Sequence, residues 1–104
     1  MSMKLPGNMQ GMMKQAQQMQ AKLQEDIAAI RVEASAGGGM VTVKMDGQKR
    51  CLGVTIDPEA AGDAEMLADT VMIAFNEAHK KVEEQAQSKM SGMLGGLGLP
   101  PGLF

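Results

Sequence analysis

Three consecutive glycines, Gly37 to Gly39, precede a β-branched run, and glycine-rich loops are one means by which proteins bind phosphate. A phosphate loop places its glycines between a strand and a helix N-terminus, where backbone N–H groups converge on the anion. Here the glycines precede a predicted strand, and no Lys-Ser or Lys-Thr pair follows them. The loop is therefore predicted to turn the chain rather than to bind a nucleotide.

Nucleophilic catalysis needs a cysteine or serine beside a base, and the chain has one cysteine, Cys51, and one histidine, His79. Cys51 falls within a predicted strand and is most simply a small filler. His79 falls near the apolar stripe of a predicted helix, where a packed or half-exposed histidine is expected. One Cys and one His also lack the clustered ligand spacing of a zinc site. We therefore predict no enzyme, with no catalytic residue, metal, cofactor or small-molecule substrate.

The charges are distributed unevenly along the 104 residues, although the formal net charge is only −2. Residues 1–24 contain three lysines and no acid, whereas residues 57–69 contain five acids and no base. These acids surround a predicted helix start, where they favour the helix dipole. The acid-free helix suits an anionic partner, because Lys and Gln donate hydrogen bonds to phosphates and base edges, although such a face is more often only solvated.

The composition bounds the class of protein. There are 12 Met and two Phe but no Trp or Tyr, so the aromatic platform that stacks single-stranded bases is missing. A single cysteine and the lack of an N-terminal apolar h-region predict a reducing cytoplasm. No run of 18 apolar residues occurs, so we expect no membrane partner. A chain of this length builds only a modest core, which a partner chain would complete.

The elements that position these residues begin with a helix from Asn8 to about Ile30, in which Met9, Ala16, Leu23 and Ile30 repeat at sevens. From Val32 to Ile56 the period changes to two, which predicts a three-stranded antiparallel meander. Asp46-Gly47 predicts a two-residue hairpin, with Met45 opposite Gln48, Val43 opposite Arg50 and Val41 opposite Leu52. One face of this sheet must then be covered. Its residues are Val41, Val43, Met45, Leu52, Val54 and Ile56.

Asp57-Pro58 predicts a single helical turn closed by Gly62, and Asp63 then caps a second long helix that runs to about Met90. Val71 and Phe75 lie on its apolar stripe.

Residues 1–90 are predicted to form one domain and residues 91–104 a Gly/Pro/Leu-rich flexible tail, which docks on the protein or binds a partner. Methionine fills irregular cores and also serves adaptable binding surfaces, and core or subunit interface is the favoured interpretation. Both helices are too long for strands of about 20 Å, so parts of each must project or pack on another subunit.

A set of short motifs, in order along nearly the whole chain, resembles the YbaB/EbfC family of bacterial nucleoid-associated proteins. The motifs are Asn8-Met9, Lys14-Gln15-Ala16-Gln17, Met19-Gln20, Ala36-Gly37-Gly38-Gly39, Asp46-Gly47, Ile56-Asp57-Pro58, Ala74-Phe75-Asn76-Glu77-Ala78, Lys80-Lys81 and Leu99-Pro100-Pro101-Gly102. No single motif is specific, but the ordered set is. The resemblance implies an α+β fold with a three-stranded antiparallel β-meander between two long helices, assembled as a tweezer-like homodimer with projecting helices.

The resemblance also implies duplex DNA as the partner, with low sequence specificity, in the cytoplasm at the nucleoid, where the protein organises the chromosome and regulates transcription. Carried over by position, the candidate DNA contacts are Lys14, Gln17, Gln18, Lys22, Lys80, Lys81 and Lys89. The candidate core or dimer-interface residues are Val41, Val43, Leu52, Val54, Ile56, Val71 and Phe75. The alternative is a protein-interaction module that engages the replication or recombination machinery through Met-lined helices and the apolar tail.

Overall fold

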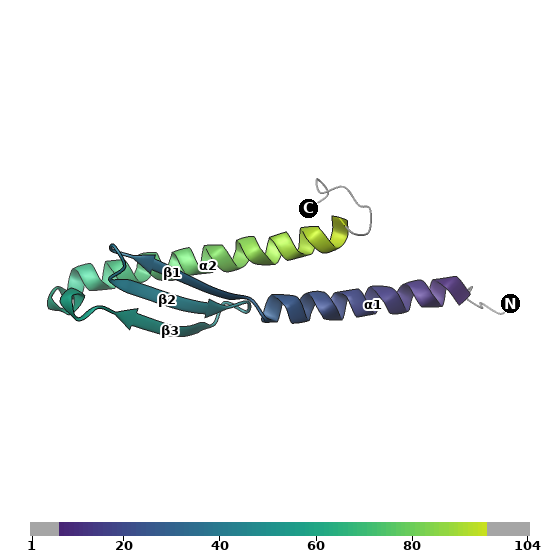
Figure 1. The fold of residues 1–104 in the computed structure, drawn as a ribbon, viewed down its shortest axis with the longest axis horizontal. Coiled ribbons are helices and arrows are strands. Elements are labelled where there is room, and N and C mark those ends of the chain that lie inside the picture. The colour runs from purple at the N-terminus through teal and green to yellow at the C-terminus, as the bar shows by residue number, and fades with distance from the viewer. Residues whose placement is uncertain (1–6, 96–104) are drawn as a thin grey trace.

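The computed structural model describes residues 7–95, which fold as two long helices and a small sheet (Figure 1). The elements are α1 (Gly7–Ala28), β1 (Arg31–Ala36), β2 (Val41–Asp46), β3 (Cys51–Ile56), the 3-10 helix η1 (Pro58–Gly62) and α2 (Ala64–Gly95). The molecule measures 75 × 24 × 19 Å, and its radius of gyration is 20.5 Å. A compact domain of this length would have a radius near 13 Å, so the helices do project beyond the sheet.

The first helix ends where the chain enters the core. Ile30 is only 3% exposed, and it follows a tightened last turn in which its N–H donates to the Ile27 carbonyl at 3.0 Å. The Arg31 guanidinium donates from Nη1 to the carbonyl oxygens of Ala28 and Ile30, at 2.9 and 2.8 Å. These bonds satisfy carbonyls left free at the helix end. The helix therefore stops at Ala28, slightly before the predicted end near Ile30.

The predicted antiparallel meander is confirmed, with strand order β1-β2-β3. The β1–β2 connection is the triple-glycine loop, in which Gly37, Gly38 and Gly39 have φ of 66°, 68° and 93°. These values lie in the region that favours glycine, because a Cβ there crowds the following carbonyl. The Met40 N–H donates to the Gly37 carbonyl at 3.3 Å and closes the turn. The loop thus reverses the chain between two strands.

The predicted register of the second hairpin is wrong. Val41 pairs with Ile56 rather than Leu52, Val43 with Val54 rather than Arg50, and Met45 with Cys51 rather than Gln48. The cause is a longer loop, in which Asp46 Oδ1 accepts from the backbone N–H of both Gln48 and Arg50 at 2.9 Å. Lys49 adopts φ of 65°, as in a three-residue loop built on a type I turn with a bulge.

A second irregularity lies between Lys44 and Met45, whose partners are Gly53 and Cys51, so Leu52 is the extra residue of a bulge. The pairing of Val41 moves four residues along β3, from Leu52 to Ile56. Because side chains alternate with a period of two, an even shift leaves Val54 and Ile56 on the predicted face. The predicted face is therefore correct for Val54 and Ile56 but wrong for Leu52, which lies at the bulge beside Glu33 and Lys44 of the polar face.

Gly47 has a role that the hairpin motif does not reveal. An added Cβ at this position would lie 1.6 Å from the carbonyl oxygen of Ile27, near the end of α1. No side chain fits there without moving backbone. The glycine allows the β2–β3 loop to pack directly on the last turn of α1, which fixes where that helix leaves the sheet.

The second long helix begins as predicted and ends later. Asp57 Oδ1 accepts from the Glu59 N–H at 2.9 Å at the start of η1, and Asp63 Oδ1 accepts from the Met66 N–H at 3.1 Å at the start of α2. The helix continues past the predicted end near Met90 to Gly95, so residues 91–95 are helical rather than irregular. The remainder of the predicted tail, residues 96–104, lies outside the described residues.

The core lies between α2 and the first two strands. Both β1 and β2 show the alternating burial of strands with one covered face. Its buried side chains are Ile30, Val32, Ala34, Val41, Val43, Met45, Ala74, Ala78 and Val82. On the opposite face the strands carry polar residues such as Ser35 and Thr42, whose hydroxyls lie 2.8 Å apart. The sheet thus has one helix-covered face and one polar face.

Candidate nucleic-acid interface

All twelve carboxylates of the chain lie between Glu25 and Glu84. Six Lys and Arg residues lie in the same span, so it carries a formal charge of −6, and the other four lysines bring the chain to −2. The two acid-free segments are therefore the beginning and the end of the sequence. Where they lie in space decides whether they form one surface.

The fold brings these segments together. The last turns of α2 run beside the C-terminal part of α1, on the side of the molecule away from the β1–β2 loop, and the N-terminal part of α1 extends beyond them (Figure 1). Met12, Ala16 and Met19 of α1 line a common groove with Met93 and Leu94 of α2. We call residues 7–24 and 85–95 together the arm end. Its described lysines are Lys14, Lys22 and Lys89, and it contains no carboxylate.

Four of the candidate DNA contacts share the outer face of α1. Lys14, Gln18 and Lys22 are spaced by four residues and therefore form one row, and Gln17 lies beside it. All four are exposed. At 100° per residue the centre of this row lies about 120° around the helix from the groove-lining Met12, Met19 and Leu23. The lysines of α1 thus face solvent and away from α2.

Two other candidates lie over the sheet instead. Lys81 Nζ donates to the carbonyl oxygen of Glu33 in β1 at 2.8 Å, which ties it to the sheet edge. Lys80 is exposed on the same turn of α2. Acidic residues precede and follow them along this helix at Glu77, Glu83 and Glu84. Lys80 and Lys81 therefore belong to a mixed-charge surface, apart from the arm end, whereas Lys89 is exposed within it.

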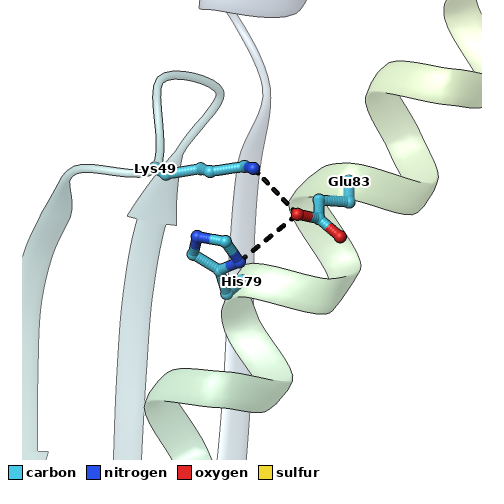
Figure 2. A network of polar contacts seen from close by, with 3 residues as sticks. All are labelled: Lys49, His79 and Glu83. Carbon is cyan, nitrogen blue, oxygen red and sulfur yellow. Dashed lines mark hydrogen bonds and ion pairs between the residues drawn. The ribbon is translucent and has the colours of Figure 1, made fainter.

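A small polar network joins the β2–β3 loop to α2 (Figure 2). Lys49 Nζ lies 2.8 Å from Glu83 Oε1, and His79 Nδ1 lies 3.6 Å from the same oxygen. The hydrogen bond and charge of Lys49, with a smaller contribution from His79, hold the pKa of Glu83 below its ordinary value. The network shows which flank of α2 faces β3, because Lys49 lies two residues before the start of that strand.

That flank continues into an exposed apolar surface. Val54 and Ile56 lie on the core-side face of the sheet but are 45% and 40% exposed, because α2 packs on β1 and β2. On α2, Phe75 and Met72 precede His79 by four and seven residues and therefore share its flank. They are 39% and 56% exposed. The uncovered part of β3 and this flank of α2 form a bare apolar surface, which we call the β3 surface.

The model of the YbaB/EbfC DNA-binding family matches residues 3–97. The chain belongs to this family. A nucleoid-associated protein of Acidobacterium capsulatum is 52% identical over 106 residues, covering 95% of this chain and 98% of its own length. A nucleoid-associated protein of Koribacter versatilis is 50% identical over 95 residues, covering 89% of this chain and 94% of its own.

The fold also matches a protein whose crystal structure is known. The crystal structure of an uncharacterised protein from Helicobacter pylori superposes with a TM-score of 0.72 at 25% identity. The match covers 88% of this chain and 99% of that one. The YbaB/EbfC family is a DNA-binding family rather than an enzyme family, which agrees with the prediction from the lone Cys and His.

Within this YbaB/EbfC chain the structure separates the predicted interface residues into two groups. Val41 and Val43 are fully buried core residues, and Val71 is partly buried against the core. Leu52, Val54, Ile56 and Phe75 are exposed and remain candidates for a dimer interface. Met72 is a further candidate for the dimer interface. In the sequence, only its helical spacing of three residues from Phe75 indicates this. The contact of Lys49 with Glu83 has no signal in the sequence, because it joins residues 34 positions apart.

Cys51 and His79, the two residues with possible catalytic chemistry, are both accessible to solvent. Cys51 is exposed at the first position of β3, and was wrongly predicted as a mid-strand filler. The His79 side chain is 38% exposed, as expected for a half-exposed histidine. Within residues 7–95 no cluster of three metal-ligating side chains occurs. In the same range neither helix is apolar enough over its length to cross a membrane.

Proposed function

We propose that this chain binds duplex DNA as a homodimer with low sequence specificity, and that it organises the chromosome and affects gene expression at the nucleoid, in the cytoplasm. The observation that carries the proposal is the arm end. Two helices from opposite ends of the chain meet there, and their described charges are all positive. The family match and the names of two relatives support DNA as the partner.

The chemistry of the arm end suits the backbone of DNA better than its base edges. Lys14 and Lys22 present ammonium groups along one row of a rigid helix, with glutamine amides between and beside them. Contacts from such groups to phosphate oxygens carry no sequence information. Residues 25–84 carry a formal charge of −6 and repel DNA, so binding is confined to the arm end and is sensitive to salt. Lys80, Lys81 and Lys89 remain candidate contacts on the second helix.

The β3 surface supports the homodimer. It exposes Val54, Ile56, Phe75 and Met72 on one face, and a twofold contact would bury that face against the same face of a second copy. Such burial yields about 25 cal/mol for each Å² of apolar surface removed from water. Two copies joined in this way carry two arm ends, which doubles the lysines available to one duplex.

Titration of a fluorescent 30-base-pair duplex at several salt concentrations tests the DNA proposal. Replacing Lys14→Gln and Lys22→Gln together should weaken binding at low salt. The slope of log affinity against log salt should fall by about 0.9 for each phosphate contact removed. Lys44→Gln is the matched control, because Lys44 is an exposed lysine of the polar sheet face. Equal loss in both variants, or no loss in the double variant, contradicts the assigned contacts.

Sedimentation tests the dimer separately. The chain has a mass of 11.0 kDa, and the wild type should sediment at twice that mass at micromolar concentration. Val54→Asp and Ile56→Asp should each shift the protein to a monomer. Thr55→Asp is the control, because Thr55 lies between them in β3 and points to the opposite face. A monomeric wild type, or a dimer that survives both changes, rules out the β3 surface.

The second candidate function is a protein-interaction module associated with replication or recombination proteins. The exposed methionines Met9, Met12 and Met13 favour it, because such side chains suit adaptable binding surfaces. Met9→Ser with Met13→Ser should then abolish a pull-down partner and leave the DNA titration unchanged. If the Lys14→Gln and Lys22→Gln variant loses DNA binding and the Met9→Ser and Met13→Ser variant still captures every partner, the hypothesis of a protein-interaction module is wrong.

A further inference from the structure

The strongest feature that the proposed function does not use is the apolar groove of the arm end. Its volume is about 390 Å³, and its lining is contributed by α1 and by the last described turns of α2. The lining residues are Met12, Gln15, Ala16, Met19, Gln20, Leu23, Met93 and Leu94. Not one of them carries a charge, so the lysine row lies on another face of α1.

The groove exists because α1 extends beyond the C-terminal end of α2 (Figure 1). Near the sheet, α2 packs against α1, but α2 ends at Gly95 while the apolar stripe of α1 continues toward its N-terminus. Met12 is 65% exposed and Met9 is 46% exposed as a result. An apolar stripe on a helix of this kind normally packs against another segment.

We propose that residues 96–104 of the same chain lie in this groove, as a strap that joins the end of α2 to the stripe of α1. The segment reads Gly-Leu-Gly-Leu-Pro-Pro-Gly-Leu-Phe and contains no charged side chain. Leu97, Leu99, Leu103 and Phe104 supply apolar groups for a groove lined by methionine, leucine and alanine. This proposal does not depend on DNA binding or on the dimer.

The position of the segment favours it over any other occupant. Met93 and Leu94 line the groove, and residue 96 follows one position after the end of α2. The segment therefore starts at the rim, where a short tether gives an effective concentration in the millimolar range. A separate partner would have to compete against that concentration.

The length of the segment fits the groove. Met12 and Leu23 are separated by about 17 Å along α1, at 1.5 Å per residue. Nine residues in extended or polyproline conformation span about 28 Å, at 3.1 Å per residue. Pro100 and Pro101 favour that conformation and reduce the entropy lost on docking.

The groove also offers partners for an extended backbone. Gln15 and Gln20 are five residues apart on α1 and flank the apolar stripe on its two sides. Each side-chain amide has donors and an acceptor, which an extended segment needs because it makes no hydrogen bonds within itself. A strap held in this way pins the two arm helices together at their far end.

Cysteine cross-linking tests the strap in the full-length chain. In a Cys51→Ala background, Ala16→Cys places a thiol in the groove and Leu103→Cys places one in the segment. The matched control replaces Gln18→Cys, on the lysine face of α1, together with Leu103→Cys. Under mild oxidation the groove pair should form a disulfide at least ten times faster than the control pair. The product should keep the mass of one chain on a denaturing, non-reducing gel.

Equal rates for the two pairs overturn the proposal. A product with the mass of two chains also overturns it, because the occupant would then be the segment of a second copy. A second readout uses methyl-labelled methionine and NMR. Replacing Leu97, Leu99, Leu103 and Phe104 by serine should move the Met12, Met19 and Met93 methyl signals and leave Met45 and Met66 in place. Unchanged Met12 and Met19 signals contradict the strap.

Discussion

The base of the molecule, residues 25–84, and the arm end differ in both packing and charge. Among residues 9–95, all ten buried hydrophobic residues lie between Ile30 and Val82, whereas every described side chain of the arm end is at least partly exposed. The base also holds every carboxylate. The base is therefore stabilised by a core, and the arm end by helix formation and by contacts between its two helices.

This difference separates stability from recognition. Most helical stability in proteins comes from tertiary packing, so the arm end depends on the base to stabilise each helix. Changes on its exposed surface should therefore alter binding and leave unfolding of the base nearly unchanged. Changes inside the base should have the reverse effect. Four predictions probe this contrast, all measured at one protein concentration because dimerisation would make stability depend on concentration.

A pair of methionines gives the largest contrast. Met45 is fully buried in β2, and Met45→Ala should lower the free energy of unfolding by about 2–5 kcal/mol, since it leaves a cavity. Met13 is 55% exposed on α1, and Met13→Ala should change it by about 0.5 kcal/mol or less. Denaturant unfolding followed by circular dichroism measures both. Similar losses at the two positions would abolish the distinction between base and arm end.

The junction between the two regions is the next most sensitive point. Gly47→Ala should lower stability by about 2–3 kcal/mol, because the new Cβ would overlap the Ile27 carbonyl and displace the end of α1. Gly53→Ala is the control, because open space surrounds a Cβ built there. Thermal unfolding compares the two variants. A Gly47→Ala protein as stable as Gly53→Ala would mean that α1 is not fixed by this contact.

The triple-glycine loop should respond less strongly. Gly38 has φ of 68° and open space around a built Cβ, so Gly38→Ala introduces only backbone strain. The expected loss is about 1 kcal/mol. Gly37→Ala should cost more, because its Cβ would also lie 2.8 Å from Thr70 Cγ2. Equal effects in the two variants would show that α2 does not pack on this loop, and DNA affinity should be unchanged in Gly38→Ala.

The smallest effect concerns the ion pair at Glu83. Lys49 lowers the pKa of Glu83 in the folded protein, so the pair stabilises above the ordinary glutamate pKa and its contribution is lost as the pH falls through the folded-state pKa. Glu83→Gln should therefore be slightly less stable than wild type at neutral pH and equal to it in acid. A double-mutant cycle with Lys49→Gln isolates the pair. A difference that grows in acid would contradict this assignment.

The β2–β3 hairpin shows where sequence reasoning fails. Asp46-Gly47 correctly predicts a turn, but the same dipeptide suits loops of two and three residues. The side chain of Asp46 selects the longer loop by accepting two backbone N–H groups, and Gly47 serves the approach of α1. Val54 and Ile56 nevertheless lie on the predicted face, because an even shift preserves it, whereas the prediction for Leu52 fails at the bulge.

The sequence by itself determined the order and type of the elements, because apolar periodicity, capping aspartates and glycine turns act between neighbours in the chain. It also determined that both terminal segments lack acids. Only the tertiary structure decided that these segments meet at one end, that α2 covers β1 and β2 and leaves Val54 and Ile56 bare, and that Lys81 is held by β1. Those outcomes depend on contacts between residues far apart in sequence, which no local pattern encodes.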